Sequence, residues 1–387
     1  MSGQERNKKF KTANVISYII FITGGFAMGF LIVKLVEDMN NKSELAGLLI
    51  AFVFVLVAMI VIMFLHIIIH EVGHLICGLI SGYKFVSFRI GSLMLKKEKG
   101  KFVFKKFKIP GTAGQCLMMP DENWNAYDYP YTLYNLGGIL ANIMVALISL
   151  GLYLSFSNTI FLREILIILF VYGTILALNN AIPMKIGGVA NDGQNILALN
   201  KNRDARRALY LQLYINGLQS EGTRLKDMSE EYFELPPNAD LTNPLIVSIG
   251  VFKSDYLQDK MEFIKAKENS LYLIENAPGL LGVHKNELTC ELLFYELIGS
   301  CREDEINRLY TDELKKHIKG TLSYLSRRRL IYTYEIFVNH DKEAAKRELE
   351  EFEKATKNYP FPSIIEVERE LIEFIDNLVV VKNIEMS

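Results

Sequence analysis

Long uninterrupted apolar runs constrain this chain more than any other feature of its sequence. From Leu45 onward, 21 consecutive residues carry no polar side chain before His66 is reached. Three further runs cover about residues 13–36, 131–155 and 160–182. A helix needs roughly 20 apolar residues to cross the bilayer core, which is about 30 Å thick. The sequence therefore predicts four membrane-spanning helices in the first half of a 387-residue chain.

The charges are divided between the two halves of the chain. The total of −1 is the sum of +6 over residues 1–195 and −7 over the remainder. Positive residues in short loops mark the cytoplasmic side of a membrane protein. In the first half they gather in the N-terminal tail and between the second and third runs: Arg6, Lys8, Lys9, Lys11, Lys84, Arg89, Lys96, Lys97, Lys99, Lys101, Lys105, Lys106 and Lys108. We therefore expect a multi-pass protein of the cell membrane whose N-terminus and acidic C-terminal half are cytoplasmic.

Residues 82–118 are too polar to span a membrane. Val86–Ile90 and Phe102–Phe107 alternate apolar and polar residues on either side of Glu98-Lys99-Gly100-Lys101, a pattern typical of a β-hairpin. Such a hairpin on the membrane surface has an open edge that can pair with an extended peptide. The alternative is a basic loop held to anionic lipid.

Three of the six histidines, His66, His70 and His74, follow one another at intervals of four residues. The last two form H-E-x-x-H with Glu71, and residues four apart share one helix face, so both imidazoles can bind one ion. Glu71 then lies where it can take a proton from an attacking water. Zinc suits such ligands best, and ionisable residues within a membrane helix are usually functional. The alternative is a hydrogen-bonded polar cluster that packs helices together.

His66 is a poor third ligand because the three histidines drift around the helix by about 40° at each step. It is expected to support the site or the packing. Asp192, just beyond the last apolar run, is the best candidate. His70 lies about 37 Å of helix after Leu45, toward the cytoplasmic face, and the fourth span also runs inward to that face. Asn191-Asp192-Gly193 can alternatively be a helix cap and turn.

Residues 45–200 resemble the site-2 proteases, which are intramembrane zinc metalloproteases. The resemblance is carried by His70-Glu71-Val72-Gly73-His74, the 86–107 hairpin, Gly137-Gly138-Ile139-Leu140-Ala141-Asn142, Asn180-Ala181-Ile182-Pro183 and Asp192-Gly193. Pro183 and Asp192 are nine residues apart, whereas the family usually separates them by about five. There is no PDZ-like insertion, so the chain is most similar to the minimal, cytoplasm-facing members with an added C-terminal domain.

The resemblance implies a role for each of these residues. His70, His74 and Asp192 are implied to bind Zn²⁺, and Glu71 to activate the attacking water. Asn142, or Asn180 in the N-x-x-P element, is implied to steady the substrate carbonyl or its oxyanion.

From about residue 197 the pattern is helical, with helices expected at 203–218, 255–275, 285–299, 312–338, 342–357 and 363–378. Paired helices of this length suit a bundle or a short solenoid similar to tetratricopeptide arrays. The basic run Arg327-Arg328-Arg329 is expected on a solvated helix face, in preference to a lipid- or substrate-binding patch.

The predicted fold is mostly α: a polytopic membrane helix bundle of about four spans with a membrane-associated β-hairpin, followed by a soluble all-α, solenoid-like domain. Its parts are a basic tail (1–12), a transmembrane metalloprotease core (13–196) that includes the hairpin (82–118), and a cytoplasmic helical domain (197–387). The composition excludes collagen-like, wholly disordered and disulfide-rich secreted proteins.

The predicted function is that of an intramembrane zinc endopeptidase. Its partners would be membrane-anchored proteins or peptides as substrates, the lipid bilayer, and a protein bound through the helical domain, with no nucleic acid. One alternative is a non-proteolytic membrane adaptor with a structural metal site. Another is a prenyl-protein type of zinc protease, whose extra Glu ligand could only be Glu164, and this residue is expected at the outer end of its span.

Overall fold

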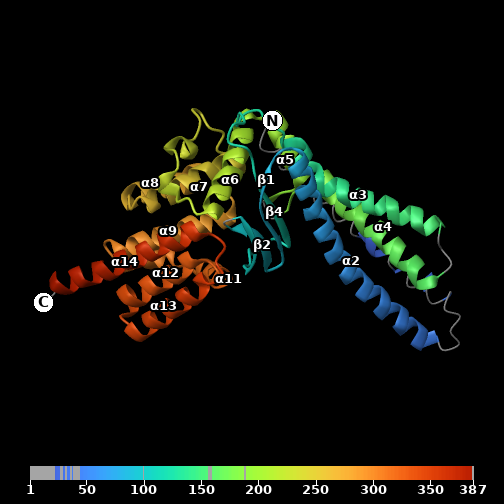
Figure 1. Cartoon of the computed structure of the whole chain (residues 1–387). Helices are drawn as coiled ribbons and strands as arrows, with labels where there is room; N and C mark the ends of the chain where they lie inside the picture. The colour runs from blue at the N-terminus through green and yellow to red at the C-terminus, as the bar shows by residue number, and fades with distance from the viewer. Residues whose placement is uncertain are drawn as a thin grey trace. The chain divides into compact units, whose positions relative to one another are not determined.

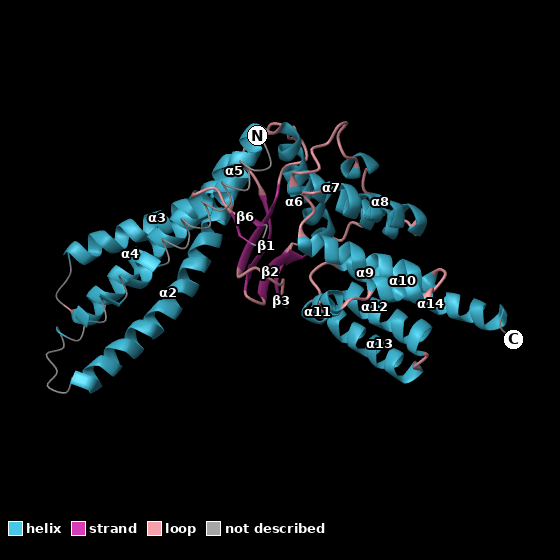
Figure 2. Cartoon of the chain, turned by 180° about the vertical axis from the view of Figure 1, so that it is seen from behind, coloured by secondary structure: helices cyan, strands magenta, loops and turns pink. Residues whose placement is uncertain are grey.

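The computed structural model describes residues 22–26, 29–30, 33–34, 37, 44–98, 100–155, 159–186 and 189–385. It is mostly helical, with a small antiparallel sheet (Figures 1 and 2). The chain divides into two compact units, which are described separately. One unit holds residues 1–84, 113–116 and 129–201, and the other holds residues 85–112, 117–128 and 202–387.

Three long helices, α2 (Glu44–Ile80), α3 (Tyr131–Ser155) and α4 (Ile160–Ala181), lie side by side in the first unit (Figure 1). Each is long and apolar enough to cross a membrane. Large apolar side chains are exposed along all three, as expected for helices that face lipid. These helices match three of the four predicted spans. The tail 1–12 and most of the first predicted span, 13–36, lie outside the described residues.

Helices α2 and α3 approach each other closely where both carry glycine. A Cβ atom added to Gly73 would lie 2.2 Å from the carbonyl oxygen of Gly137, and one on Gly137 would lie 2.4 Å from that of Gly73. Small residues allow such close backbone contact within a membrane. After α4, the short strands β5 (Lys185–Ile186) and β6 (Val189–Ala190) lead into α5 (Asp192–Lys201).

The segment predicted as one hairpin forms a sheet of four strands in the order β3-β2-β1-β4. The strands are β1 (Lys84–Ile90), β2 (Leu93–Glu98), β3 (Lys101–Lys106) and β4 (Gly114–Met119). The turn at Glu98–Lys101 therefore joins β2 to β3, and the two predicted strands are not direct neighbours.

Strand β2 escaped prediction because one of its two lysines is unusual. Lys96 is fully buried, and its ammonium donates to the carbonyl oxygens of Ser220 at 3.1 Å and Pro360 at 2.5 Å. These partners lie more than a hundred residues away along the chain. A lysine that would ordinarily indicate an exposed loop is thus a buried anchor for the sheet.

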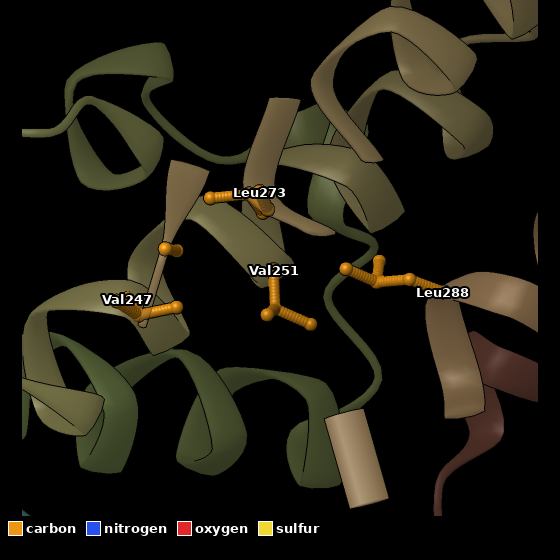
Figure 3. Packing of buried hydrophobic residues seen from close by; sticks show 5 residues of the cluster. Val247, Val251, Leu273 and Leu288 are labelled. Atoms are coloured by element: carbon orange, nitrogen blue, oxygen red, sulfur yellow. The ribbon is translucent and has the colours of Figure 1, made fainter. Parts of the chain in front are cut away.

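The remaining helices of the second unit form its core. Val247, Val251, Leu273 and Leu288 pack together between α7, α8 and α9 (Figure 3). The elements are α6 (Arg203–Glu221), η1 (Leu225–Asp227), η2 (Glu230–Phe233), α7 (Pro244–Asp259), α8 (Phe263–Asn276), α9 (Gly282–Ile298), α10 (Glu303–Leu309), α11 (Asp312–Gly320), α12 (Leu325–Tyr334), η3 (Glu335–Asn339), α13 (Lys342–Thr356) and α14 (Pro362–Glu385).

Two of the helices predicted in this half are each divided. The predicted helix 255–275 breaks between α7 and α8, where Met261 has a φ of 59° in the left-handed region. The predicted helix 312–338 breaks between α11 and α12. Apolar periodicity continues across both breaks, which is why the sequence did not reveal them.

The expected solvated face at Arg327-Arg328-Arg329 is wrong. The side chains of Arg327 and Arg329 are fully buried. Arg329 donates to Glu291 of α9 and Glu368 of α14, both at 2.7 Å, and Arg327 pairs with Glu287 of α9. Helix α12 lies among helices that supply carboxylates from distant parts of the sequence, so its arginines are internal ion-pair partners.

Candidate metal centre

The H-E-x-x-H motif lies on α2, the long helix of the first unit. His70 and His74 are one turn apart, and their Nε2 atoms approach to 3.1 Å. Their rings are nearly perpendicular, with an interplanar angle of 84°. The four-residue spacing thus brings both imidazoles to one point, as the sequence predicted.

Asp192, the first residue of α5, meets these histidines. Its Oδ2 lies 3.2 Å from Nε2 of His70 and 3.5 Å from Nε2 of His74. In the described residues these three form the one group of His, Cys, Asp or Glu side chains arranged closely enough to share a metal ion.

Asn191, which the sequence offered as part of a helix cap, holds Asp192 in place. Its Oδ1 accepts from the backbone N–H groups of Gln194 and Met184, and its Nδ2 donates to the carbonyl oxygens of Asn179 and Ile182. Asn191 therefore caps α5 and ties it to the end of α4. The cap expected within Asn191-Asp192-Gly193 is real, but it leaves the Asp192 carboxylate free to face the histidines.

The backbone sets the protonation pattern of His74. Its Nδ1 lies 2.8 Å from the carbonyl oxygen of Tyr134, which can only accept a hydrogen bond, so Nδ1 carries the hydrogen. The Nε2 atom of the neutral ring then presents a lone pair. Such contacts to the second ring nitrogen are typical of metal-binding histidines.

Asp192 adds a negative charge to the same point. Burial raises its pKa, but the combined effect of its contacts with His70 and His74 outweighs burial and lowers the pKa to about 2, so the carboxylate is ionised. Its buried Oδ2 has no hydrogen-bond partner. Electron-rich atoms facing one another at such distances call for a cation between them.

The spacing of the three atoms fits zinc. Metal–ligand bonds of about 2.0–2.1 Å in a tetrahedron give ligand–ligand edges of about 3.3–3.4 Å. The three observed edges are 3.1, 3.2 and 3.5 Å. Two imidazoles and one carboxylate leave a fourth position open, as in catalytic zinc sites.

Glu71 lies between the histidines and the first residues of β4. Its carboxylate is hydrogen-bonded by the backbone of Cys116, and a Cβ atom on Gly114 would come within 2.7 Å of its Oε1. Burial and the nearby charge of Glu71 raise the pKa of Cys116 to about 12. The thiol therefore stays protonated, and Glu71 is the group able to accept a proton here.

The two asparagines of the site differ in their surroundings. Asn142 is almost fully buried, with its amide between His66 and His70. Asn180 is half-buried, and its Nδ2 donates to the carbonyl oxygen of Leu176 on its own helix. Its own backbone oxygen lies against Gly193, next to Asp192.

Glu164 is not part of the site. It lies near the start of α4 and contacts its neighbour Arg163 at 3.3 Å. Among the described residues it does not join the metal-binding group, so the structure gives no support to a site with an additional Glu ligand.

Two further residues of the site were not predicted from the sequence: Gly138 and Tyr134. Gly138 makes room for the ring of His70, because an added Cβ atom would lie 2.3 Å from Cε1. Gly138 was visible as part of the Gly137–Asn142 motif. The role of Tyr134 gave no signal in the sequence, because it acts through a backbone carbonyl.

Comparison with known proteins supports the same conclusion. Residues 58–352 match the sequence profile described as peptidase family M50. No curated protein and no solved structure matches the chain. The profile match covers most of the chain and includes both the H-E-x-x-H helix and Asp192. This chain belongs to peptidase family M50, the site-2 protease family.

Proposed function

We propose that this chain, a membrane metalloprotease of the site-2 protease type, is a zinc endopeptidase that hydrolyses peptide bonds in or near the transmembrane segments of membrane-anchored proteins or peptides. One observation carries the proposal. Three metal-binding atoms converge at 3.1–3.5 Å beside a carboxylate on a helix able to cross a membrane.

His70, His74 and Asp192 would hold the Zn²⁺ ion. When bound, zinc polarises the scissile carbonyl and makes water more acidic. Glu71 takes a proton from the attacking water, whose oxygen bonds to the carbonyl carbon. The C–N bond then breaks, and Glu71 passes the proton to the leaving amine. The products are a carboxyl group and an amine, which balances the addition of one water.

The substrate must present an extended segment to this carboxylate. Helical amides are bonded internally, so a substrate helix has to unwind locally before it can be cut. Strand β4 lies at an edge of its sheet, and its first residues, Gly114–Cys116, lie against Glu71. We propose that the unwound segment pairs with this edge strand.

Asn180 is better placed than Asn142 to steady the substrate carbonyl. Both ends of the Asn142 amide are already engaged by histidines. The side chain of Asn180 is half-exposed, and within the described part of the chain only its nitrogen is engaged.

We further propose that residues 13–196 form the catalytic core, that residues 197–387 form a cytoplasmic helical domain, and that the N-terminus is also cytoplasmic. The excess of Lys and Arg in the N-terminal tail and around the sheet supports this orientation. The helical domain is then available on the cytoplasmic side to bind a protein partner.

The test compares Glu71→Gln with wild-type protein purified in detergent. The variant should bind zinc in a 1:1 ratio but no longer cleave a reconstituted membrane-anchored peptide, because glutamine cannot accept the proton. Glu44→Gln is the matched control, since it lies on the same helix about 40 Å away. His70→Ala should lose zinc. Wild-type cleavage by Glu71→Gln would refute the mechanism, and wild-type protein that binds zinc without cleaving any substrate would favour the adaptor.

A further inference from the structure

A chain of buried polar groups connects α4 to the metal-binding histidines. The carbonyl oxygen of Leu169 lies 3.0 Å from Nε2 of His66, and Nδ1 of the same ring lies 2.9 Å from the amide of Asn142. The other end of that amide lies 3.4 Å from Nδ1 of His70. His66 and Asn142 are exposed by no more than 1 %.

The hydrogen positions in this series of polar groups follow from the Leu169 carbonyl at one end. The Leu169 carbonyl can only accept, so Nε2 of His66 carries a hydrogen. A neutral ring then has a bare Nδ1. Asn142 must therefore offer its NH₂ group to His66.

The remaining assignments follow in order. With its NH₂ group turned to His66, Asn142 presents its oxygen to His70. The structure places Oδ1 of Asn142 toward His66 and Nδ2 toward His70. Turning the amide by 180° exchanges these two atoms and gives every group in the series a hydrogen-bond partner. The Nδ1 atom of His70 then donates to Asn142. The Nε2 atom of His70 is left bare, and it is the atom that faces Asp192.

We propose that Asn142, itself held by His66, is the positioning residue that fixes His70 as a metal ligand. It would do so by accepting the Nδ1 hydrogen and by setting the orientation of the ring. This proposal rests on the proposed zinc function, because it specifies how one of the ligands is held.

Close packing at glycines restricts the positions of His66, Asn142 and His70. A Cβ atom on Gly173 would lie 2.8 Å from Cε1 of His66 and 3.0 Å from the backbone oxygen of Asn142. A Cβ atom on Gly138 would overlap the ring of His70. Helices α2, α3 and α4 therefore meet at glycines on both sides of Asn142.

The two histidine ligands consequently differ in how they can be perturbed. His74 is held by a backbone carbonyl, which no substitution removes. His70 is held by a side chain, so the contact can be deleted or replaced. Contacts of this kind typically contribute about 10–100-fold to metal affinity.

The experiment measures zinc affinity of the full-length protein in detergent by competition with a chromophoric chelator. Asn142→Leu should weaken zinc binding by about 10–100-fold. Asn142→Asp should restore part of this affinity, because a carboxylate also accepts the Nδ1 hydrogen of His70 although it offers no N–H to His66. Cobalt-substituted Asn142→Leu should show an altered visible d–d spectrum, and the spectrum of Asn142→Asp should shift back toward that of the wild type.

The matched control is Asn135→Leu, on the same helix two turns earlier. Asn135 is also buried, and its amide donates to the carbonyl oxygen of Tyr131 on its own helix. Its loss should leave zinc affinity and the cobalt spectrum unchanged. Thermal unfolding with excess chelator shows whether each metal-free variant is folded.

His66→Leu provides a second test should Asn142→Leu fail to fold, and it should weaken zinc binding less than the loss of Asn142 does. Wild-type affinity in either His66→Leu or Asn142→Leu would overturn the proposal. So would an Asn142→Asp variant that binds as weakly as Asn142→Leu. Absence of zinc from wild-type protein would instead overturn the proposed function itself, so the two failures are distinguishable.

Discussion

Replacing Gly138 with alanine should remove zinc without unfolding the protein. The added methyl group would lie 2.3–2.5 Å from three atoms of the His70 ring. Carbon atoms in favourable contact are about 3.5–4.0 Å apart, so the ring must move by at least about 1 Å. Metal–ligand distances tolerate only about ±0.2 Å. His70 in the variant can therefore no longer reach the position that it shares with His74 and Asp192.

The expected loss of zinc affinity in Gly138→Ala is more than about 100-fold, because a ligand itself is displaced rather than one of its supporting contacts. Crowding of the helix interface should lower the free energy of unfolding by about 1–3 kcal/mol. The assay is zinc competition in detergent, together with thermal unfolding in excess chelator.

Gly151→Ala is the matched control for Gly138→Ala. Gly151 lies on the same helix, and an added Cβ atom would meet nothing within 4 Å. This change should keep zinc binding and leave stability equal or slightly higher, because alanine favours helix over glycine by about 1 kcal/mol. Wild-type zinc affinity in Gly138→Ala would refute the steric reasoning.

Two further predictions concern α5 and the C-terminal unit. Asn191→Ala should lower the thermal unfolding midpoint and weaken zinc binding, because loss of the cap costs about 0.5–2 kcal/mol and releases Asp192; equal midpoints for variant and wild type would contradict this. Burial and the charges of Glu291 and Glu368 raise the pKa of Asp255 to about 7, above its ordinary value of 3.8. The folded form therefore loses stability as pH rises from about 4 to 7. Asp255→Asn, which cannot ionise, should raise the free energy of unfolding by up to about 4 kcal/mol at pH 8 and have little effect at pH 4. Denaturation at both pH values checks this, and an equal effect at both would contradict it.

The sequence was most informative where a single helix carries the pattern. His70, Glu71 and His74 lie within five residues, so helical geometry alone predicts that they share a face. Asp192 was harder, because its approach depends on where α4 ends. Its placement could be inferred because a membrane limits the depth at which each span ends.

Groups that act through distant or backbone partners could not be predicted. The Tyr134 carbonyl has no sequence signature, since every residue has one. Lys96 and Arg329 read as solvated charges, because their acceptors come from segments far along the chain. The role of His66 also depended on Asn142, whose position relative to α2 is fixed only by the packing of α3.

The anchoring of Lys96 has a consequence for any attempt to shorten this protein. The chain crosses between its two units five times, at 84/85, 112/113, 116/117, 128/129 and 201/202, so no single cut separates them. A polypeptide ending at residue 201 would keep the whole sheet but lose both carbonyl acceptors of the Lys96 ammonium. It would also lack Tyr324 and Tyr359, whose rings pack on Phe107. The C-terminal helices are thus a structural requirement for the sheet whose edge strand is β4. A loss of activity after their deletion would therefore not show by itself that they bind a partner.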